Sequence, residues 1–299
     1  MWHVFPIDPG LAVAVAALLG LAVGACLTSV AHRLPRMIER EWLIQLRQAQ
    51  AEYAGRHQGP DQAPGPESAA VSPLHADLDH PYHLARPGWH CPACHAPVRG
   101  WRALPLAGWL LLRGRCAACG AAIGLRYPAM ELATSGLFAL CAWRFGPTPV
   151  ALCAMAFGAA LLVLAWVDLE SGLLPDAVTL PLAWAGLLVN LQGALAPLPL
   201  AVLGAACGYL FLWLVFHGFR FVTGREGMGH GDFKLMAALG AWLGLAALPW
   251  LLLGASLAGA LAGVALRLAG RVGRGQPLPF GPYLAAGGIL MLLALGPPA

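Results

Sequence analysis

Charged side chains are scarce in this chain. Asp, Glu, Lys and Arg make up 11% of its 299 residues, whereas hydrophobic residues make up 59%. A soluble globular domain carries about 25% charged residues, and the deficit here is concentrated in long uncharged stretches. The mean hydropathy of +0.68 agrees with this pattern. The composition therefore excludes an ordinary soluble globule and predicts a membrane protein.

Several motifs of soluble proteins are also missing. No Gly-Lys-Ser/Thr accompanies the glycines at 224–231, so a phosphate-binding loop is not predicted. No basic stripe with interleaved aromatic residues is present, which argues against a nucleic-acid partner despite the formal net charge of +4. The apolar run 11–30 follows Asp8 rather than a basic segment and is too long for the core of a secretory signal. We expect it to be retained as a helix.

Apolar runs predict an all-α polytopic membrane protein with about eight transmembrane helices. Several runs are shorter than the roughly 20 residues of a perpendicular span, which suits tilted helices or helices around a water-filled site. The expected spans are 10–31, 128–145, 149–167, 177–192, 199–221, 233–247, 249–268 and 282–296. We divide the chain into a first transmembrane helix at 1–31, a small cytoplasmic domain at 32–127 and a seven-helix membrane domain at 128–299.

The basic residues predict the orientation of these helices. With eight spans, residues 32–127 lie on the same side of the membrane as the loops 168–176, 222–232 and 269–281. Every Lys and Arg except Arg144 then lies on or beside that side, which the positive-inside rule identifies as the cytoplasm. Within 32–127, residues 36–57 predict an amphipathic helix at the membrane surface, and residues 58–73 have the composition of a linker.

Four cysteines form two CxxC pairs separated by 21 residues, Cys91-Pro-Ala-Cys94 and Cys116-Ala-Ala-Cys119. Each pair can bind one metal ion from a tight turn, and four thiolates complete a tetrahedron around zinc. Two disulfides are the alternative, which a cytoplasmic location disfavours, and one pair acting in redox chemistry is another. His90 and His95 flank the first pair and could replace a cysteine as metal ligand, although four thiols are already available. We favour a structural Zn²⁺ ion held by the four cysteines.

Two aspartates stand where apolar segments meet water. Asp168 follows a long apolar run, and Asp232 precedes another in Gly229-His-Gly231-Asp232. The predicted topology puts both on the cytoplasmic face. A carboxylate beside hydrocarbon is costly and usually functional, and a pair can cleave a peptide bond when one activates water and the other donates a proton.

Structural roles for these aspartates are the alternative. Asp232 is placed to cap the helix that follows it, and Asp176 is placed to cap its own following helix. Asp168 could simply be a solvated residue at the end of its apolar run. We expect a cap for Asp176 and catalysis for Asp168 and Asp232. Glycines at 229 and 231 allow close approach of the backbone to a substrate strand or a partner helix.

Over nearly its whole length the chain resembles the type IV prepilin peptidase family of leader peptidases and N-methyltransferases. The resemblance includes the cysteine tetrad and the segments around the two aspartates. Besides the tetrad, the matching stretches are 24–35, 126–131, 168–176, 226–234 and 279–283. The resemblance implies cleavage of a basic leader from type IV prepilins and pseudopilins at the cytoplasmic face of the bacterial inner membrane. It also implies methylation of the new N-terminus with S-adenosylmethionine, and it matches the catalytic aspartates to Asp168 and Asp232.

One stretch departs from the family pattern. Members often carry Ser-Phe-x-Asn where this chain has Ala25-Cys-Leu-Thr28, which puts methyl transfer in more doubt than proteolysis. Besides the two glycines, we assign Lys234 and Glu131 to substrate binding, with Lys234 steering an acidic group on the pilin helix. Two rival hypotheses stay open: a peptidase without methyltransferase activity, and a non-enzymatic assembly factor that recruits partners through its zinc domain.

Overall fold

The computed structural model describes residues 8–57, 83–84, 88–91, 93–225, 227–271, 273 and 278–294. Within these ranges the chain forms helices and no strand, apart from two isolated bridges in the cysteine-rich segment. The all-α prediction is confirmed. The predicted linker at 58–73 lies outside the described residues.

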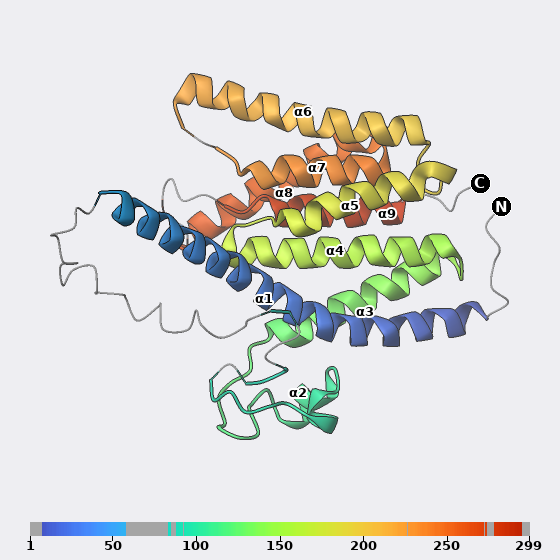
Figure 1. Ribbon diagram of the computed structural model, residues 1–299. Coiled ribbons are helices and arrows are strands. Elements are labelled where there is room, and N and C mark those ends of the chain that lie inside the picture. Colours follow the sequence, from blue (N-terminus) through green and yellow to red (C-terminus); the bar gives the residue numbers. More distant parts are fainter. Residues whose placement is uncertain are drawn as a thin grey trace.

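The helices stand where the apolar runs predicted them, with one difference at the N-terminus. The segments 10–31 and 36–57 form a single helix, α1 (Pro9–His57), which continues through Pro35. An interior proline removes one backbone hydrogen bond and kinks a helix, and α1 changes direction along its length in Figure 1. The other long helices are α3 (Arg126–Phe145), α4 (Pro149–Ser171), α5 (Asp176–Val189), α6 (Leu198–Thr223), α7 (His230–Leu243), α8 (Leu248–Leu268) and α9 (Gly281–Ala294).

Four of the described helical segments are long and apolar enough to cross a bilayer, namely those built on α1, α4, α6 and α8. Their outward faces remain apolar. On α8, for example, the exposed side chains Leu253, Leu257 and Leu261 recur at every fourth residue and form one stripe. An apolar surface of this extent is a membrane-facing surface, so the chain is a multi-pass membrane protein. Helices α5, α7 and α9 have only 14 residues each.

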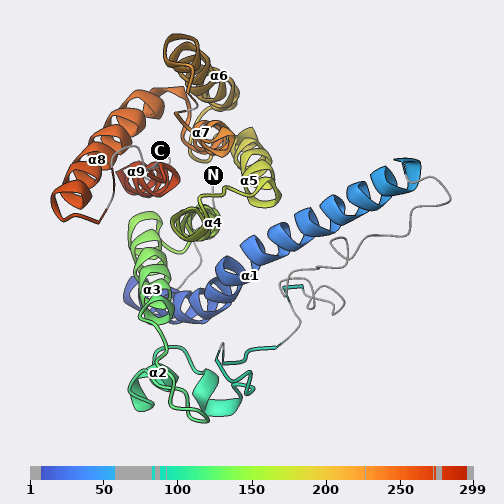
Figure 2. The same ribbon diagram turned by 90° about the vertical axis from the view of Figure 1, so that its left-hand side faces the viewer.

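Helix α7 occupies the centre of the bundle, between α5, α6 and α9 (Figure 2). Its side chains Phe233, Leu235 and Leu239 are fully buried. Trp242, near its end, stacks on Phe157 of α4 with ring centroids 4.5 Å apart and donates a 2.7 Å hydrogen bond to the carbonyl of Leu182 in α5. These contacts fix the position of α7 relative to both neighbouring helices.

Helices α1 and α3 pack closely because small residues lie between them. A Cβ atom added at Gly20 would lie 2.7 Å from Cα of Ser135, and one added at Gly24 would lie 2.7 Å from Cα of Glu131. Glycines four residues apart allow this approach in membrane helices. Ser135 also donates a 2.9 Å hydrogen bond from its hydroxyl to the carbonyl of Ala17. The start of α3 is therefore held against α1.

Candidate functional site

The two predicted catalytic aspartates lie at the same end of the bundle. Asp168 is in the last turn of α4, and Asp232 is the third residue of α7. The end of α4 and the start of α7 lie on the same side of the bundle in Figure 1. Both aspartates are 5% exposed, and their carboxylates are close enough for electrostatic repulsion. The structure thus brings together two residues that are 64 positions apart in the sequence.

The start of α9 completes this site. The backbone N–H of Gly281 donates a 2.9 Å hydrogen bond to Oδ2 of Asp168. A Cβ atom at position 281 would lie 2.6 Å from that same oxygen, closer than van der Waals contact permits. Glycine therefore lets the backbone of α9 approach the carboxylate and hold it. Reasoning from residue chemistry missed Gly281, although it lies in the segment 279–283 that carries part of the family resemblance.

Leu174, in the turn between α4 and α5, links the glycine before Asp232 to this arrangement. A Cβ atom at Gly231 would lie 2.6 Å from Cβ of Leu174, and one at Gly281 would lie 3.3 Å from its Cδ1. The close approach expected of Gly231 is thus to another part of the chain. Gly229 precedes α7 in extended backbone. In the part of the chain that the structure describes, and apart from its chain neighbours, only the carboxylate of Asp232 lies within 4 Å of a Cβ atom added there.

Lys234 forms an ion pair with Asp176. Its Nζ lies 2.6 Å from both carboxylate oxygens of Asp176, and this contact joins the first turns of α7 and α5. The prediction that Asp176 caps its helix is wrong, because Pro175 occupies the cap position and Asp176 is the first helical residue. The carboxylate faces Lys234, whose charge it neutralises.

Glu131 lies on α3 beside the cysteine-rich segment. It is 9% exposed, and Oε2 accepts a 2.7 Å hydrogen bond from the backbone N–H of Leu106. Among the described residues, no hydrogen bond or ion pair joins Glu131 to Asp168 or Asp232. Glu131, which the sequence analysis assigns to substrate binding, is thus held against the backbone of the cysteine-rich segment.

A second ion pair ties the start of α3 to the end of α4. Nη1 of Arg126 lies 3.2 Å from Oε1 of Glu170, which also accepts a 3.0 Å hydrogen bond from the indole N–H of Trp166. Glu170 follows Asp168 by two residues. The pair therefore places the first turn of α3 at the same end of the bundle as the aspartates.

The four predicted metal-ligating cysteines form one cluster. The sulfur atoms of Cys91, Cys94, Cys116 and Cys119 all lie within 4.8 Å of one another. The pairs Cys91–Cys119 and Cys94–Cys116 are each 3.9 Å apart. Tetrahedral zinc with bonds of about 2.3 Å requires sulfur atoms about 3.8 Å apart. The cluster can therefore hold such an ion.

The two CxxC turns have the same backbone hydrogen bonds. The N–H of Cys91 bonds to the carbonyl of Ala96 and that of Cys116 to the carbonyl of Ala121, at 2.9 and 2.8 Å. Backbone N–H groups of Cys119 and Ala118 stabilise the Cys116 thiolate and lower its pKa to about 6. The pKa of the Cys94 thiol is shifted the other way: the backbone N–H of Ala96 lowers it, but hydrogen bonds with the neighbouring cysteines raise it more. A bound metal ion would therefore have to displace the proton of Cys94, because a thiol must lose its proton to become a ligand. His90 and His95 stack on each other, with ring centroids 5.6 Å apart, and are not part of the cluster.

Comparison with known proteins matches both halves of the chain. The model of the type IV leader peptidase family matches residues 155–264, which include both aspartates, and that of the bacterial peptidase A24 N-terminal domain matches residues 18–145. No solved structure matches the chain.

Curated relatives match over most of their length. A prepilin leader peptidase/N-methyltransferase of Burkholderia pseudomallei (strain 1026b) is 45% identical over 95% of this chain and 85% of its own. Proteins of the same name from Aeromonas salmonicida (strain A449) and Neisseria gonorrhoeae are 46% and 41% identical, over 92% and 95% of this chain and 88% and 91% of their own. The chain therefore belongs to the prepilin leader peptidase/N-methyltransferase family.

Proposed function

We propose that this protein is an aspartic endopeptidase that removes the leader peptide from type IV prepilins and pseudopilins and then methylates the new N-terminus. The names of its relatives state both activities. The observation that carries the peptidase activity is the buried pair Asp168 and Asp232, gathered at one end of the bundle with a backbone N–H aimed at one of them.

The geometry suggests how the two carboxylates share the reaction. Two nearby carboxylates share a proton, because like charges at short range do not both ionise cheaply. Asp168 accepts the N–H of Gly281, and such a hydrogen bond favours the ionised form. Asp168 is therefore the group that activates water, and Asp232 carries the proton that is delivered to the scissile amide.

We assign this end of the bundle to the cytoplasmic face of the bacterial inner membrane. Arg126, Arg220 and Lys234 all lie at helix ends on this side, as the positive-inside rule requires. A basic leader then stays in the cytoplasm, and the hydrophobic pilin helix lies in the bilayer. The scissile bond comes to the boundary between them, where the aspartates lie.

For substrate binding we retain the start of α7. Among the described residues, only the carboxylate of Asp232 lies within 4 Å of a Cβ atom added at Gly229, so a substrate strand can approach that carboxylate here. Gly231 lets α7 pack against Leu174 in the turn before α5, and this contact holds the start of α7 in place beside Asp168. Lys234 can bind an acidic group of the pilin only if it first releases Asp176, with which it forms an ion pair.

We assign a structural Zn²⁺ ion to the four cysteines, because their spacing fits a closed tetrahedral site with no position left for a substrate. Such an ion would hold together a segment with almost no regular secondary structure. The methyl donor is S-adenosylmethionine, because the relatives are named N-methyltransferases.

The test is cleavage of a prepilin in membranes by wild type, Asp168→Asn and Asp232→Asn, read as product mass. Both variants should lose cleavage while protein level and zinc content stay unchanged. Glu52→Gln, a charge removal on the exposed part of α1, is the matched control and should cleave normally.

The same experiment separates the rival hypotheses. Cleavage that survives either aspartate substitution would remove that residue from the mechanism. A wild type that does not itself cleave the prepilin would favour the assembly factor. A wild-type product that is cleaved but carries no added methyl group would leave a peptidase alone.

A further inference from the structure

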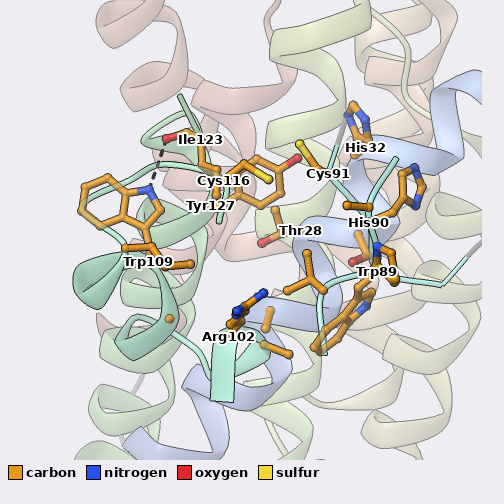
Figure 3. Close-up of a pocket in the computed structure, with 18 of the residues that line it drawn as sticks. Thr28, His32, Trp89, His90, Cys91, Arg102, Trp109, Cys116, Ile123 and Tyr127 are labelled. Carbon is orange, nitrogen blue, oxygen red and sulfur yellow. Dashed lines mark hydrogen bonds between the residues drawn. The ribbon is translucent and has the colours of Figure 1, made fainter. Parts of the chain in front are cut away.

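A cavity of about 670 Å³ lies between α1, the cysteine-rich segment and the first turns of α3. Figure 3 shows side chains from all three parts around it, with Thr28 and His32 on α1, Trp109 and Arg102 in the cysteine-rich segment, and Tyr127 at the start of α3. None of its lining residues is Asp168 or Asp232. Proteolysis leaves this cavity without a role.

The volume matches a small-molecule site. Pockets for cofactors and other small ligands range from about 300 to 1,000 Å³ and combine apolar walls with a few polar groups. A helical polypeptide segment would need an open groove, but this cavity has walls from three separate parts of the chain.

The apolar walls include three large aromatic side chains, Trp89, Trp109 and Tyr127. Trp109 is held in place by a 3.2 Å hydrogen bond from its indole N–H to the carbonyl of Ile123, drawn in Figure 3. Tyr127 has its ring beside the guanidinium of Arg126, 5.3 Å from the ring centroid. Ordered aromatic faces suit a flat heterocyclic base and also attract a cationic centre.

Charged groups of both signs line the same cavity. Glu131 contributes one carboxylate, of which Oε2 is bound to the N–H of Leu106. Arg36 and Arg102 contribute guanidinium groups, which bind carboxylates in a planar, two-pronged geometry. The ligand that fits has an aromatic base, a hydroxyl-bearing or cationic part for Glu131, and a carboxylate for arginine.

We propose that this cavity is the binding site for S-adenosylmethionine, with Trp89 and Tyr127 beside the adenine or the sulfonium, Glu131 binding the ribose hydroxyls or the ammonium, and arginine binding the carboxylate. This inference rests on the methyltransferase part of the proposed function. A basic leader does not fit, because its several cations would face the arginines with Glu131 as the one carboxylate among the described residues that line the cavity, whereas S-adenosylmethionine brings a carboxylate of its own. A phosphate-bearing lipid headgroup would satisfy those arginines but would leave the carboxylate of Glu131 facing a like charge.

The location suits transfer to a freshly cut pilin. Tyr127 adjoins Arg126, which pairs with Glu170 two residues after Asp168, so cavity and aspartates share one end of the bundle. In the transfer, the amine nitrogen forms a bond to the methyl carbon and the bond from that carbon to sulfur breaks. S-adenosylhomocysteine leaves with the electron pair, and the methylated ammonium releases one proton to water.

The stretch that departs from the family pattern borders this cavity. Ala25 and Thr28 are lining residues, and the hydroxyl of Thr28 donates a 2.8 Å hydrogen bond to the carbonyl of Gly24 within α1. Thr28 therefore offers the ligand a smaller polar group than asparagine would. Because the remaining polar groups come from other parts of the chain, the departure does not by itself remove the site.

The test is direct binding of S-adenosylmethionine and S-adenosylhomocysteine to the full-length protein with zinc bound, by calorimetry in detergent. Glu131→Gln and Trp89→Ala should each weaken binding of both ligands by at least 10-fold. The matched controls Glu52→Gln and Trp184→Ala, both exposed and outside the cavity, should bind as wild type does. Zinc content and elution volume report folding of every variant.

The outcomes are separable from those of the proposed function. Unchanged affinity in folded Glu131→Gln and Trp89→Ala would overturn this site, even if the wild type methylates pilins. Displacement of the bound ligand by phosphatidylglycerol micelles but not by S-adenosylhomocysteine would overturn it in favour of a lipid site. A wild type that cleaves but binds neither ligand would refute both the site and the methyltransferase activity, while leaving the peptidase intact.

Discussion

Gly281→Ala tests whether the start of α9 positions the proposed catalytic carboxylate. The added methyl group would lie 2.6 Å from Oδ2 of Asp168 and 3.1 Å from its Cγ, where ordinary contact begins at 3.4 Å. The carboxylate or the start of α9 must therefore move by about 0.8 Å, a distance that follows from the difference between those contacts. The 2.9 Å hydrogen bond from the Gly281 N–H is stretched or lost at the same time.

The expected consequence is a large loss of peptidase rate. A displacement of about 1 Å at a reacting group can cost on the order of 10²-fold in rate, which corresponds to about 2.7 kcal/mol of transition-state stabilisation. We therefore expect Gly281→Ala to cut the rate of leader removal on the order of 10²-fold. Binding of S-adenosylmethionine should not change, because Gly281 does not line the cavity at α1 and α3.

The assay is single-turnover cleavage of a purified prepilin in detergent, with enzyme in excess. Gly218→Ala in α6 is the matched control, because a Cβ atom there meets no other atom within 4 Å. Normal zinc content and normal donor binding show that Gly281→Ala is folded. A folded Gly281→Ala protein that cleaves within three-fold of wild type would refute the argument that this backbone contact positions Asp168.

Two further variants test charge and metal. Lys234→Ala removes the ion pair with Asp176, whose two side chains are 30% and 55% exposed. The free energy of unfolding should therefore fall by only about 0.5 kcal/mol after allowing for solvent screening. Thermal unfolding measures this change, and a fall above about 2 kcal/mol would contradict the prediction. If Lys234 steers an acidic pilin residue, cleavage of prepilins with that residue should fall more than cleavage of prepilins without it. Replacing both cysteines of the first CxxC pair with serine should abolish zinc binding. It should also weaken binding of S-adenosylmethionine at least 10-fold, because the cysteine-rich segment forms one wall of the cavity. Metal analysis and calorimetry measure the two effects, and a zinc-free protein with normal affinity for S-adenosylmethionine would contradict the expectation.

Much of this architecture follows from the sequence because a bilayer leaves few choices. Uncharged runs must become helices in hydrocarbon, since every backbone polar group needs an internal partner. The runs expected at 128–145 and 199–221, for example, are α3 and α6 within a few residues. The cysteine cluster was predictable for a similar reason, because two CxxC turns at this spacing suit one tetrahedral ion.

The parts that the sequence did not reveal depend on contacts between distant segments. The segments 10–31 and 36–57 were expected as separate helices, but one helix continues through Pro35. Asp176 has the sequence context of a cap, yet Lys234 on another helix determines its role. Gly281 acts through its backbone N–H, which no residue-type pattern reveals. Glu131 accepts a hydrogen bond from the backbone of Leu106 in the cysteine-rich segment, and this contact also follows from no residue-type pattern.

The enclosure of α7 has a consequence for how the protein enters the membrane. With 14 residues and a rise of 1.5 Å per residue, α7 is about 21 Å long, whereas the hydrocarbon layer is about 30 Å thick. It also begins with His230, Gly231 and Asp232, and the insertion of such a polar start into hydrocarbon is unfavourable. Such a segment gains its stability from α5 and α6, against which it packs. Insertion should therefore proceed with these three helices as one unit, and the aspartate pair assembles only when that unit meets α4.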